Sequence, residues 1–258
     1  MPSILLLAFA ATLVWLERRR PLRRRVDPGP RRVARNLAIS AVTVATLHAT
    51  ERPVVRRLTH WVERRGWGIV PGLRLPGWLA AALTVVLFDY TLYLWHILLH
   101  RVPLLWRFHL AHHIDLDLDV TTALRFHFGE FLLSVPWRAA QILLVGATPR
   151  TLELWQRLTL AEVLFHHSNL RLPGRIEGWL SRLIVTPRLH GIHHSTVQAQ
   201  RNSNFSSGLV VWDTLHGTLL RDVPQRQITI GVPPYVDEAA VRLGRTLLIP
   251  FVSPRDRG

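Results

Sequence analysis

Four long apolar runs, separated by polar and arginine-rich segments, dominate the pattern of this chain. They are Ser3–Leu16, Asn36–Thr50, Trp78–His100 and Phe131–Ala147. A helix that crosses a hydrocarbon core about 30 Å thick needs roughly 20 apolar residues, so the third run is long enough to cross and the second is short enough to be tilted or re-entrant. The pattern predicts an all-α membrane protein with about four membrane-embedded helices.

The remaining segments predict a helical hairpin and a less regular C-terminal part. Leu152–His166 carries charged residues among leucines, which is typical of an amphipathic helix packed on the bundle, and it could form the return arm of a hairpin. After the last histidine cluster, Gln227–Val232 favours a short strand and Val236–Leu248 a short helix. We expect the tail Ser253–Gly258 to be disordered.

Composition restricts the class of protein further. All 32 basic residues are arginine, the formal net charge is +15, and 48% of the residues are hydrophobic. Arginines next to apolar runs favour a membrane protein over a nucleic-acid binder, because they match lipid headgroup anchors and form no patch interleaved with aromatics. The absence of cysteine excludes disulfides, zinc–thiolate sites and thiol nucleophiles, so nitrogen and oxygen must hold any metal.

The position of the arginines predicts a topology. No basic residue precedes the first apolar run, and arginines follow it, which favours an uncleaved anchor with residues 18–35 in the cytoplasm. The second apolar run would then leave the cytoplasm, the third would return to it, and the segment Phe131–His166 would leave and come back. All three histidine clusters described next would reach the same side. We therefore expect a multi-pass protein whose histidines form a helical cap on the cytoplasmic side.

Three histidine clusters are the strongest chemical signal in the chain. They are His96-x3-His100, His109-x2-His112-His113 and His190-x2-His193-His194. From composition alone, chance would give the HxxHH pattern only about 0.04 times in a chain of this length, and it occurs twice. Neutral imidazole is the commonest protein ligand for transition metals, so the clusters predict a histidine-rich metal centre.

The spacing within the clusters favours two metal ions. Residues three and four apart share one face of a helix, whereas adjacent residues diverge by about 100° and can reach two metals or two sides of one metal. Eight imidazoles exceed the roughly four to six ligands that one metal takes, and His127 and His167 would raise the number to ten. Imidazole suits iron, zinc, copper and nickel, so the pattern by itself leaves the metal open.

The clusters and their surroundings resemble the fatty acid hydroxylase superfamily, also called the sterol desaturase family. The resemblance covers roughly Leu79–Thr218, and the order and spacing of its motifs agree. It lies in Tyr93–His113, Phe165–Leu170, Thr186–Ser195, and Asn202–Phe205 followed by Trp212–Thr218. The chain departs from the usual family pattern at Ile97, at Phe128-Gly129 and at His216, none of which removes a candidate ligand.

The resemblance implies a membrane oxygenase with two histidine-bound iron ions. Such an enzyme hydroxylates or desaturates a lipid, sterol or isoprenoid C–H bond with O2 and electrons from a separate ferredoxin or cytochrome. It implies a catalytic domain at residues 77–220, after anchor segments and a basic linker at 1–76 and before a C-terminal extension at 221–258. The implied iron ligands are His96, His100, His109, His112, His113, His127, His167, His190, His193 and His194.

Several polar residues near the clusters are candidates for orienting the ligands by hydrogen bonds. They are Asp89, Asn169, Asn204 and Asp213. Asp89 lies two turns before His96 and could orient His96 or His100, a role favoured because a carboxylate in an apolar span is costly; the alternative is that it caps or solvates a polar patch between helices. Glu130 is expected to pair with Arg125 or to cap a helix, His166 remains open between ligation and hydrogen bonding, and the arginine runs are interpreted as topological determinants.

Two other functions stay compatible with the residues. A histidine-rich membrane metal transporter would use the same ligands, but the clusters sit at helix ends and the apolar runs lack the carboxylates expected along an ion path. A non-catalytic lipid-binding relative would keep the fold, although the intact histidine set argues against it.

Overall fold

The computed structural model describes residues 2–252, and these form helices joined by short loops. No strand forms among them, apart from isolated bridges at Pro21–Leu170, Ile184–Leu209 and Ser195–Ile230. The predicted all-α class is therefore confirmed. The strand expected at Gln227–Val232 is wrong, since only Ile230 takes part in a bridge, and the predicted disordered tail lies outside the described residues.

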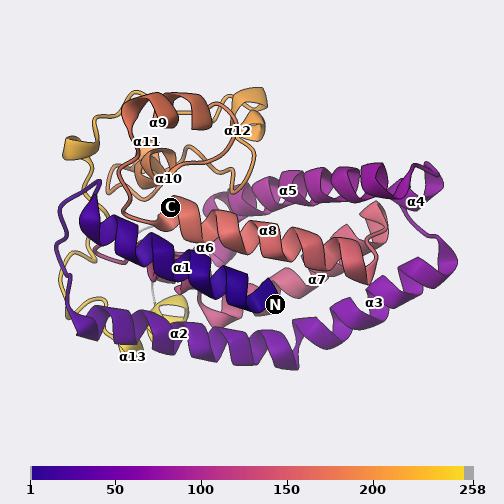
Figure 1. The fold of residues 1–258 in the computed structure, drawn as a ribbon. Helices are drawn as coiled ribbons and strands as arrows, with labels where there is room; N and C mark the ends of the chain where they lie inside the picture. The colour runs from indigo at the N-terminus through magenta and orange to yellow at the C-terminus, as the bar shows by residue number, and fades with distance from the viewer. Residues whose placement is uncertain (1, 253–258) are drawn as a thin grey trace.

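The long helices run lengthwise beside one another, and most of the short helices gather at one end, whereas α4 (Ile69–Gly72) lies at the other (Figure 1). The long ones are α1 (Pro2–Arg19), α2 (Pro30–Ala49), α3 (Glu51–Arg65), α5 (Gly77–Arg101), α7 (Phe128–Val145) and α8 (Pro149–His167). The shorter ones are α4, α6 (Pro103–His113), α9 (Gly174–Leu180), α10 (Pro187–His193), α11 (Gln198–Arg201), α12 (Val211–Leu215), α13 (Leu243–Leu248), and the 3-10 turns η1 (Thr122–Leu124), η2 (Gln225–Gln227) and η3 (Ile249–Phe251).

Local sequence signals set many of the helix boundaries. Proline occupies the first turn of α2, α6, α8 and α10, where its missing N–H costs nothing. Gly146 ends α7 in the left-handed conformation, with φ of 84°, and Thr148 then opens α8 in a capping box with Thr151. These signals form the predicted turn between α7 and α8, but α8 packs chiefly against α5 and α10 rather than against α7.

Two of the apolar clusters connect the helices around the histidines. One lies between α3, α5, α7 and α8, where the rings of Phe88 and Trp155 pack with centroids 5.1 Å apart. The other joins α6 to the C-terminal segment, with Trp106 and Leu110 against Val241 and Ile249. The C-terminal segment therefore shares a core with a helix that carries three histidines.

Two helices, α5 and α7, are long and apolar enough to cross a membrane by length and composition. The first two apolar runs lie in α1 and α2, which leave large apolar side chains exposed. These include Ile4, Leu5, Leu7, Leu37 and Val44. The finding supports a membrane protein, while the number of crossings stays a prediction.

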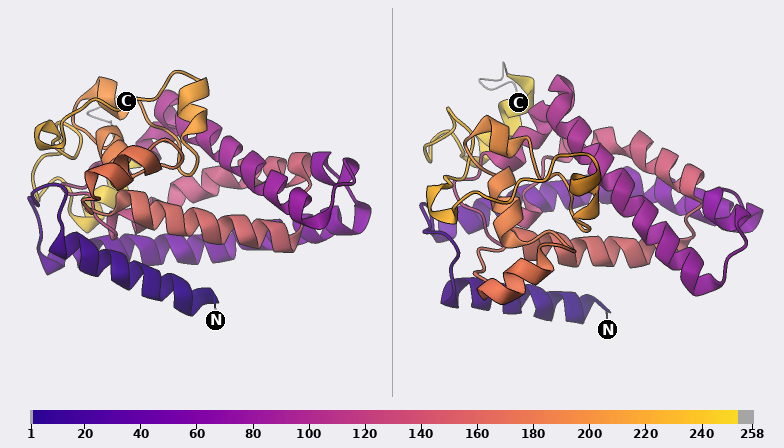
Figure 2. Two further views of the ribbon diagram at one scale, coloured as in Figure 1. Left: turned by 45° about the horizontal axis from the view of Figure 1, so that its top comes forward. Right: turned by 90° about the horizontal axis from the view of Figure 1, so that it is seen from above.

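All histidine clusters lie at the same end of the bundle. The C-terminal ends of α5 and α8 meet the short helices α6 and α10 there, beside the linker between α1 and α2 (Figures 1 and 2). This arrangement brings the arginine-rich linker and the histidines together, as the predicted topology requires. Which side of a membrane this end faces remains a prediction.

Candidate metal centre

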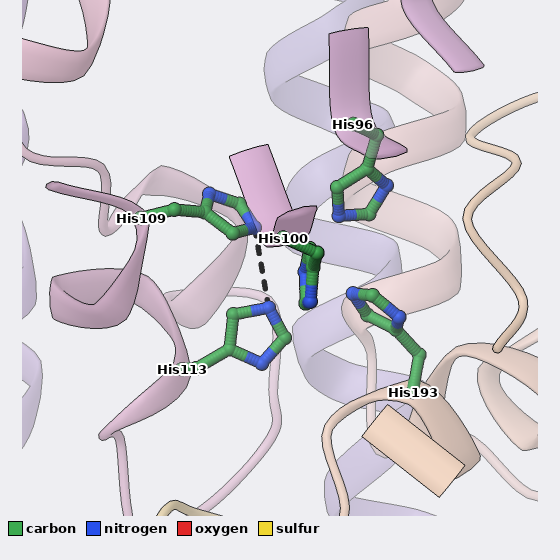
Figure 3. Close-up of side chains that lie close together, drawn as sticks. All are labelled: His96, His100, His109, His113 and His193. Atoms are coloured by element: carbon green, nitrogen blue, oxygen red, sulfur yellow. Dashed lines mark hydrogen bonds between the residues drawn. The ribbon is translucent and has the colours of Figure 1, made fainter. Parts of the chain in front are cut away.

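Five buried histidines from three helices converge on one point, and we call them the five-histidine group. One ring nitrogen of each lies within 4.8 Å of those of the other four. α5 supplies His96 and His100, α6 supplies His109 and His113, and α10 supplies His193 (Figure 3). Folding thus brings together histidines from all three clusters of the sequence.

Four further buried histidines form a second cluster, the four-histidine group. His112 comes from α6, His167 from α8, His190 from α10, and His194 directly follows α10. The Nε2 atom of His167 lies 3.0 Å from that of His112 and 3.0 Å from that of His190. Nine histidines thus provide two separate sets of converging nitrogen atoms.

The HxxHH pattern explains how one short helix serves both groups. Adjacent side chains on a helix point about 100° apart. His112 and His113 therefore enter different groups, and so do His193 and His194. The rings of His113 and His194 stack with centroids 4.3 Å apart, so the two groups are in direct contact.

Hydrogen bonds on the outer side of the rings orient three histidines of the five-histidine group. Nδ1 of His96 donates to the carbonyl of Phe205 at 2.7 Å, and Nδ1 of His193 donates to that of Ser203 at 2.8 Å. His109 places Nδ1 3.1 Å from a carboxylate oxygen of Glu130. Because Nδ1 carries the proton in each ring, Nε2 keeps a lone pair that faces the group.

The four-histidine group shows that this donor set fits a metal cation. His112 and His167 both donate Nδ1–H to backbone carbonyls, at 3.2 Å and 2.8 Å, so their two Nε2 lone pairs face each other at 3.0 Å. That contact is repulsive without a cation between the rings. Burial lowers the pKa of His167 to about 3, and that of His112 well below its usual value, so a proton does not fill this role near neutral pH.

The spacing also matches metal ligation. Two imidazoles that bind one ion at 2.0–2.1 Å, at right angles, have their nitrogens about 3 Å apart. The five-histidine group contains further unpartnered nitrogens, since both ring nitrogens of His100 are buried without a hydrogen bond. Buried polar atoms are normally satisfied, so these atoms also fit a bound ion.

His127 and His166 lie outside both groups. Nδ1 of His127 accepts a hydrogen bond from Gly129 N at 3.0 Å and so caps α7, while its Nε2 lies 3.1 Å from the carbonyl of Leu247. The structure therefore does not bring this predicted ligand to the other nine. His166 points Nδ1 at the carbonyl of Ser207, at 3.0 Å, and packs its ring against His190.

The loop that follows α11 carries the carbonyls of Ser203 and Phe205, which accept from His193 and His96, and other contacts hold this loop in place. Its Asn204 has a left-handed φ of 53° and donates to the carbonyls of Leu189 and Leu220. Asp213 accepts from the backbone N–H groups of Phe205 and Ser206, at 2.8 and 3.0 Å. Both predicted residues thus act on the ligands indirectly, by fixing the segment whose carbonyls orient His96 and His193.

The other two polar candidates also brace loops and do not touch a ligand ring. Asp89 accepts from Leu209 N at 3.0 Å and from the indole of Trp212 at 2.7 Å. Asn169 exchanges hydrogen bonds with the backbone of Arg23, at 2.9 Å each. The hydrogen bonds of Asp89 go to the 208–212 segment and not to His96 or His100.

Two features of the site escaped the sequence interpretation. Glu130 contacts His109, a role signalled only by its place shortly after His127. The arginine-rich stretch 18–35 is partly structural, because Arg23, Arg32 and Arg35 are buried. Arg32 pairs with Asp115 and Asp119, just after the HxxHH cluster of α6, in an alternating Asp-x-Asp-x-Asp pattern that could have signalled them. Arg35 lies 3.8 Å from Asp115, whereas Arg23 donates to the carbonyl of Pro187 and to Gln225.

An apolar cavity of about 380 Å³ adjoins the histidines. Side chains of α2, α5, α7 and α8 form its walls, including Leu47, Leu92, Trp95 and Leu160. Histidines of both groups contribute to the same wall, among them His96, His109, His112, His167 and His190. A chain of apolar carbons in this cavity would lie directly against both groups.

Comparison with known families agrees with this geometry. The family model described as fatty acid hydroxylase matches residues 81–218, which include all nine converging histidines. The chain belongs to the fatty acid hydroxylase family. The resemblance seen in the sequence is thereby confirmed over nearly the same range.

Curated relatives of this family member are lipid-modifying enzymes by name. An ornithine lipid hydroxylase of Rhizobium tropici is 36% identical over 58% of this chain and 44% of its own length. An alkylglycerol monooxygenase of Xenopus tropicalis is 28% identical over 56% of this chain and 31% of its own, and a cholesterol 25-hydroxylase-like protein of Danio rerio is 32% identical over 58% of each. The alignments thus span less than two thirds of these relatives. No solved structure matches the chain significantly.

Proposed function

We propose that this protein is a membrane-bound oxygenase that acts on a C–H bond of a lipid, either hydroxylating it or converting it into part of a C=C bond. The observation that carries the proposal is the pair of buried histidine groups opening on one apolar cavity. The names of the relatives, which refer to ornithine lipids, alkylglycerols and cholesterol, support a lipid, sterol or isoprenoid substrate.

The proposed cofactor is a pair of iron ions. The five-histidine group would hold one ion and the four-histidine group the other. Imidazole nitrogen suits iron, and two bound irons would supply the activation of O2. Overall, R–H, O2, two electrons and two protons give R–OH and one water, whereas desaturation removes a second hydrogen and gives a C=C bond and two waters.

The chain's own residues orient the histidine rings, place the hydrocarbon of the substrate and exclude water. The carbonyls of Phe205 and Ser203 and the carboxylate of Glu130 hold three rings with Nε2 facing inward. The apolar walls place a hydrocarbon against the histidines and keep bulk water out. The electrons come from a separate donor, and an acidic ferredoxin or cytochrome would match the arginine-rich end of the bundle.

The proposed location is a membrane, crossed more than once. α5 and α7 would cross, α1 and α2 would be embedded, and the histidine end would face the cytoplasm. The arginines of the linker and the exposed apolar faces of α1 and α2 support this orientation.

Metal content and lipid turnover test the proposal together. Purified protein should hold two irons per chain and should place an oxygen atom from O2 in a lipid, or desaturate it, when given a reductant. His113→Ala and His190→Ala should each abolish turnover and lower the iron content. His60→Ala, at a side chain 50% exposed, is the matched control and should change neither. Metal uptake by proteoliposomes without lipid oxidation would instead identify a transporter, and lipid binding without metal a non-catalytic relative.

A further inference from the structure

A polar stripe runs along the cavity face of the otherwise apolar helix α7. It consists of Glu130, Ser134, Arg138 and Gln141, which all line the cavity and follow one another at helical spacing. Glu130 contacts His109 at the metal centre. Arg138 is eight residues further along, which places it about 12 Å away along the helix axis.

Arg138 lies at the centre of a buried polar cluster. Its Nε lies 3.5 Å from a carboxylate oxygen of Glu51, the first residue of α3, and its Nη1 donates to Gln141 at 2.7 Å. The hydroxyl of Ser134 lies 3.3 Å from the other oxygen of Glu51 and 2.9 Å from the carbonyl of Phe131, and its one proton is shared between these acceptors. Charged groups inside an apolar helix are expensive, so a cluster of this kind in a cavity wall points to a ligand.

The cluster can still accept a polar ligand group. The guanidinium carbon of Arg138 lies over the ring of Trp155, 4.4 Å from its centroid, a cation–π contact that helps to position it. Among the described residues, no hydrogen bond uses Nη2 of Arg138, and this atom is not among the fully covered ones. Arg138 therefore has a donor free for a group in the cavity.

We infer that Glu51, Ser134, Arg138 and Gln141 bind the polar group of the lipid substrate and thereby set which carbon meets the histidines. The inference rests on the proposed function, because it describes the substrate of the same cavity. The span of about 12 Å between Arg138 and Glu130 would be the distance from the polar group to the oxidised carbon.

The charges of the cluster define the class of polar group. Arg138 and Glu51 are paired, so the subsite has no net charge to offset an anion. A free carboxylate or a phosphate would lie next to Glu51 and be repelled. An uncharged group with both an acceptor and a donor fits, because it can accept from Arg138 and donate to Glu51, as an amide or a hydroxyl does.

Binding of four probes with equal carbon number tests the subsite without turnover. We would measure binding of palmitamide, hexadecanol, palmitate and hexadecane to the purified iron-loaded protein, in competition with radiolabelled palmitamide. Palmitamide and hexadecanol should bind about tenfold or more tightly than palmitate and hexadecane, because each hydrogen bond to a charged group adds affinity. Equal affinity for palmitamide and hexadecane would overturn the inference.

Variants separate ligand binding from a purely structural role of the ion pair. E51Q/R138Q removes both charges and leaves none unpaired, and it should erase the preference for palmitamide over hexadecane. Gln141→Leu removes one polar group without touching the ion pair and should weaken the preference if the double variant does not fold. Arg150→Gln, at an exposed arginine that begins α8, is the control and should keep it. A lower melting temperature with an unchanged preference would show a structural role only and overturn the inference.

The position of oxidation distinguishes failure of the subsite from failure of the proposed function. Across fatty amides of three lengths, the oxidised carbon should keep a constant distance from the amide, and E51Q/R138Q should scatter it. Oxidation at a constant distance from the methyl end would refute the subsite and leave the oxygenase intact. Selective binding of palmitamide with no oxidation under any condition would refute the oxygenase and leave the subsite.

Discussion

Arg32 and Asp115 form a two-pronged ion pair in the interior of the protein, with side chains 1% and 0% exposed. Nε of Arg32 lies 2.8 Å from Oδ1 of Asp115, and Nη2 lies 2.8 Å from Oδ2. Burial alone would raise the pKa of Asp115, but the charges of Arg32 and Arg125 overcome this effect and hold the pKa at about 2. The pair ties α2 to the segment directly after His112 and His113, and thus the linker to the metal centre.

Breaking this pair should unfold the histidine end. Arg32→Met leaves the carboxylate of Asp115 buried without its partner, which should cost about 3–5 kcal/mol of unfolding free energy. The melting temperature and the iron content of the purified variant should both fall. Arg31→Met removes the exposed neighbouring arginine and should change neither. Equal melting temperatures for the two variants would contradict the assignment.

Asp213→Asn should weaken one metal group selectively. The loop held by Asp213 carries the carbonyls that orient His96 and His193, and both of these belong to the five-histidine group. Removal of such an orienting group typically lowers metal affinity 10–100-fold. Titration of metal-free protein against a competing chelator should show one weakened and one unchanged affinity, whereas Asp222→Asn, at an exposed residue, should leave both unchanged. Equal weakening of both affinities would refute this selectivity.

Glu130→Leu should release the ring of His109. The carboxylate accepts from Nδ1 and keeps Nε2 pointed at the group, so its loss should lower metal affinity about 10–100-fold. Glu130→Gln retains an acceptor and should lose less. Retention of iron after a timed chelator challenge measures the effect, with Glu153→Gln on the exposed face of α8 as the control. Loss of iron in the control to the same degree would argue against a specific role.

The metal-free protein should lose stability as the pH falls below about 6.5. Burial keeps the pKa of His167 at about 3, below the unfolded value of 6.5, so the unfolded state binds the proton first. The stability that neutral His167 contributes is complete above pH 6.5. It falls by about 1.4 kcal/mol per pH unit until the pH reaches the folded pKa. Melting temperatures of chelator-treated protein between pH 7 and 5 check this, and a flat profile would contradict it.

That the histidines gather in one place was predictable because helical spacing is local. HxxHH on a helix places three imidazoles on nearly one face, and the divergence of His112 from His113 left open whether they reach two metals or two sides of one, which the two separate groups now answer for the ring positions. The all-α class followed from the length of the apolar runs for the same reason. His127 shows the limit, since its family motif was recognisable but its ring caps α7 and contacts Leu247.

Long-range pairing was beyond prediction. Nothing near Arg32 in the sequence distinguishes it from exposed Arg31, and only packing against Asp115 does so. Glu130 was expected to pair with Arg125 or to cap a helix, yet Arg125 donates to the carbonyl of Ala111 and to Asn36, and His127 caps α7. Each such choice depends on groups about 20 to 90 residues away, whose approach no local periodicity encodes.

The sequence alone determined what this protein can bind, namely transition metals on nitrogen ligands within apolar helices, because residue type and helical spacing suffice for both. Only the tertiary structure decided that the histidines divide into groups of five and four, and that α6 and α10 each contribute side chains to both groups. It also decided that an apolar cavity, with a polar cluster at Arg138, adjoins these groups. The physical reason is that a cavity and a ligand set are made by side chains from different helices. Their positions follow from how the helices pack, and each helix by itself specifies only the face that it presents.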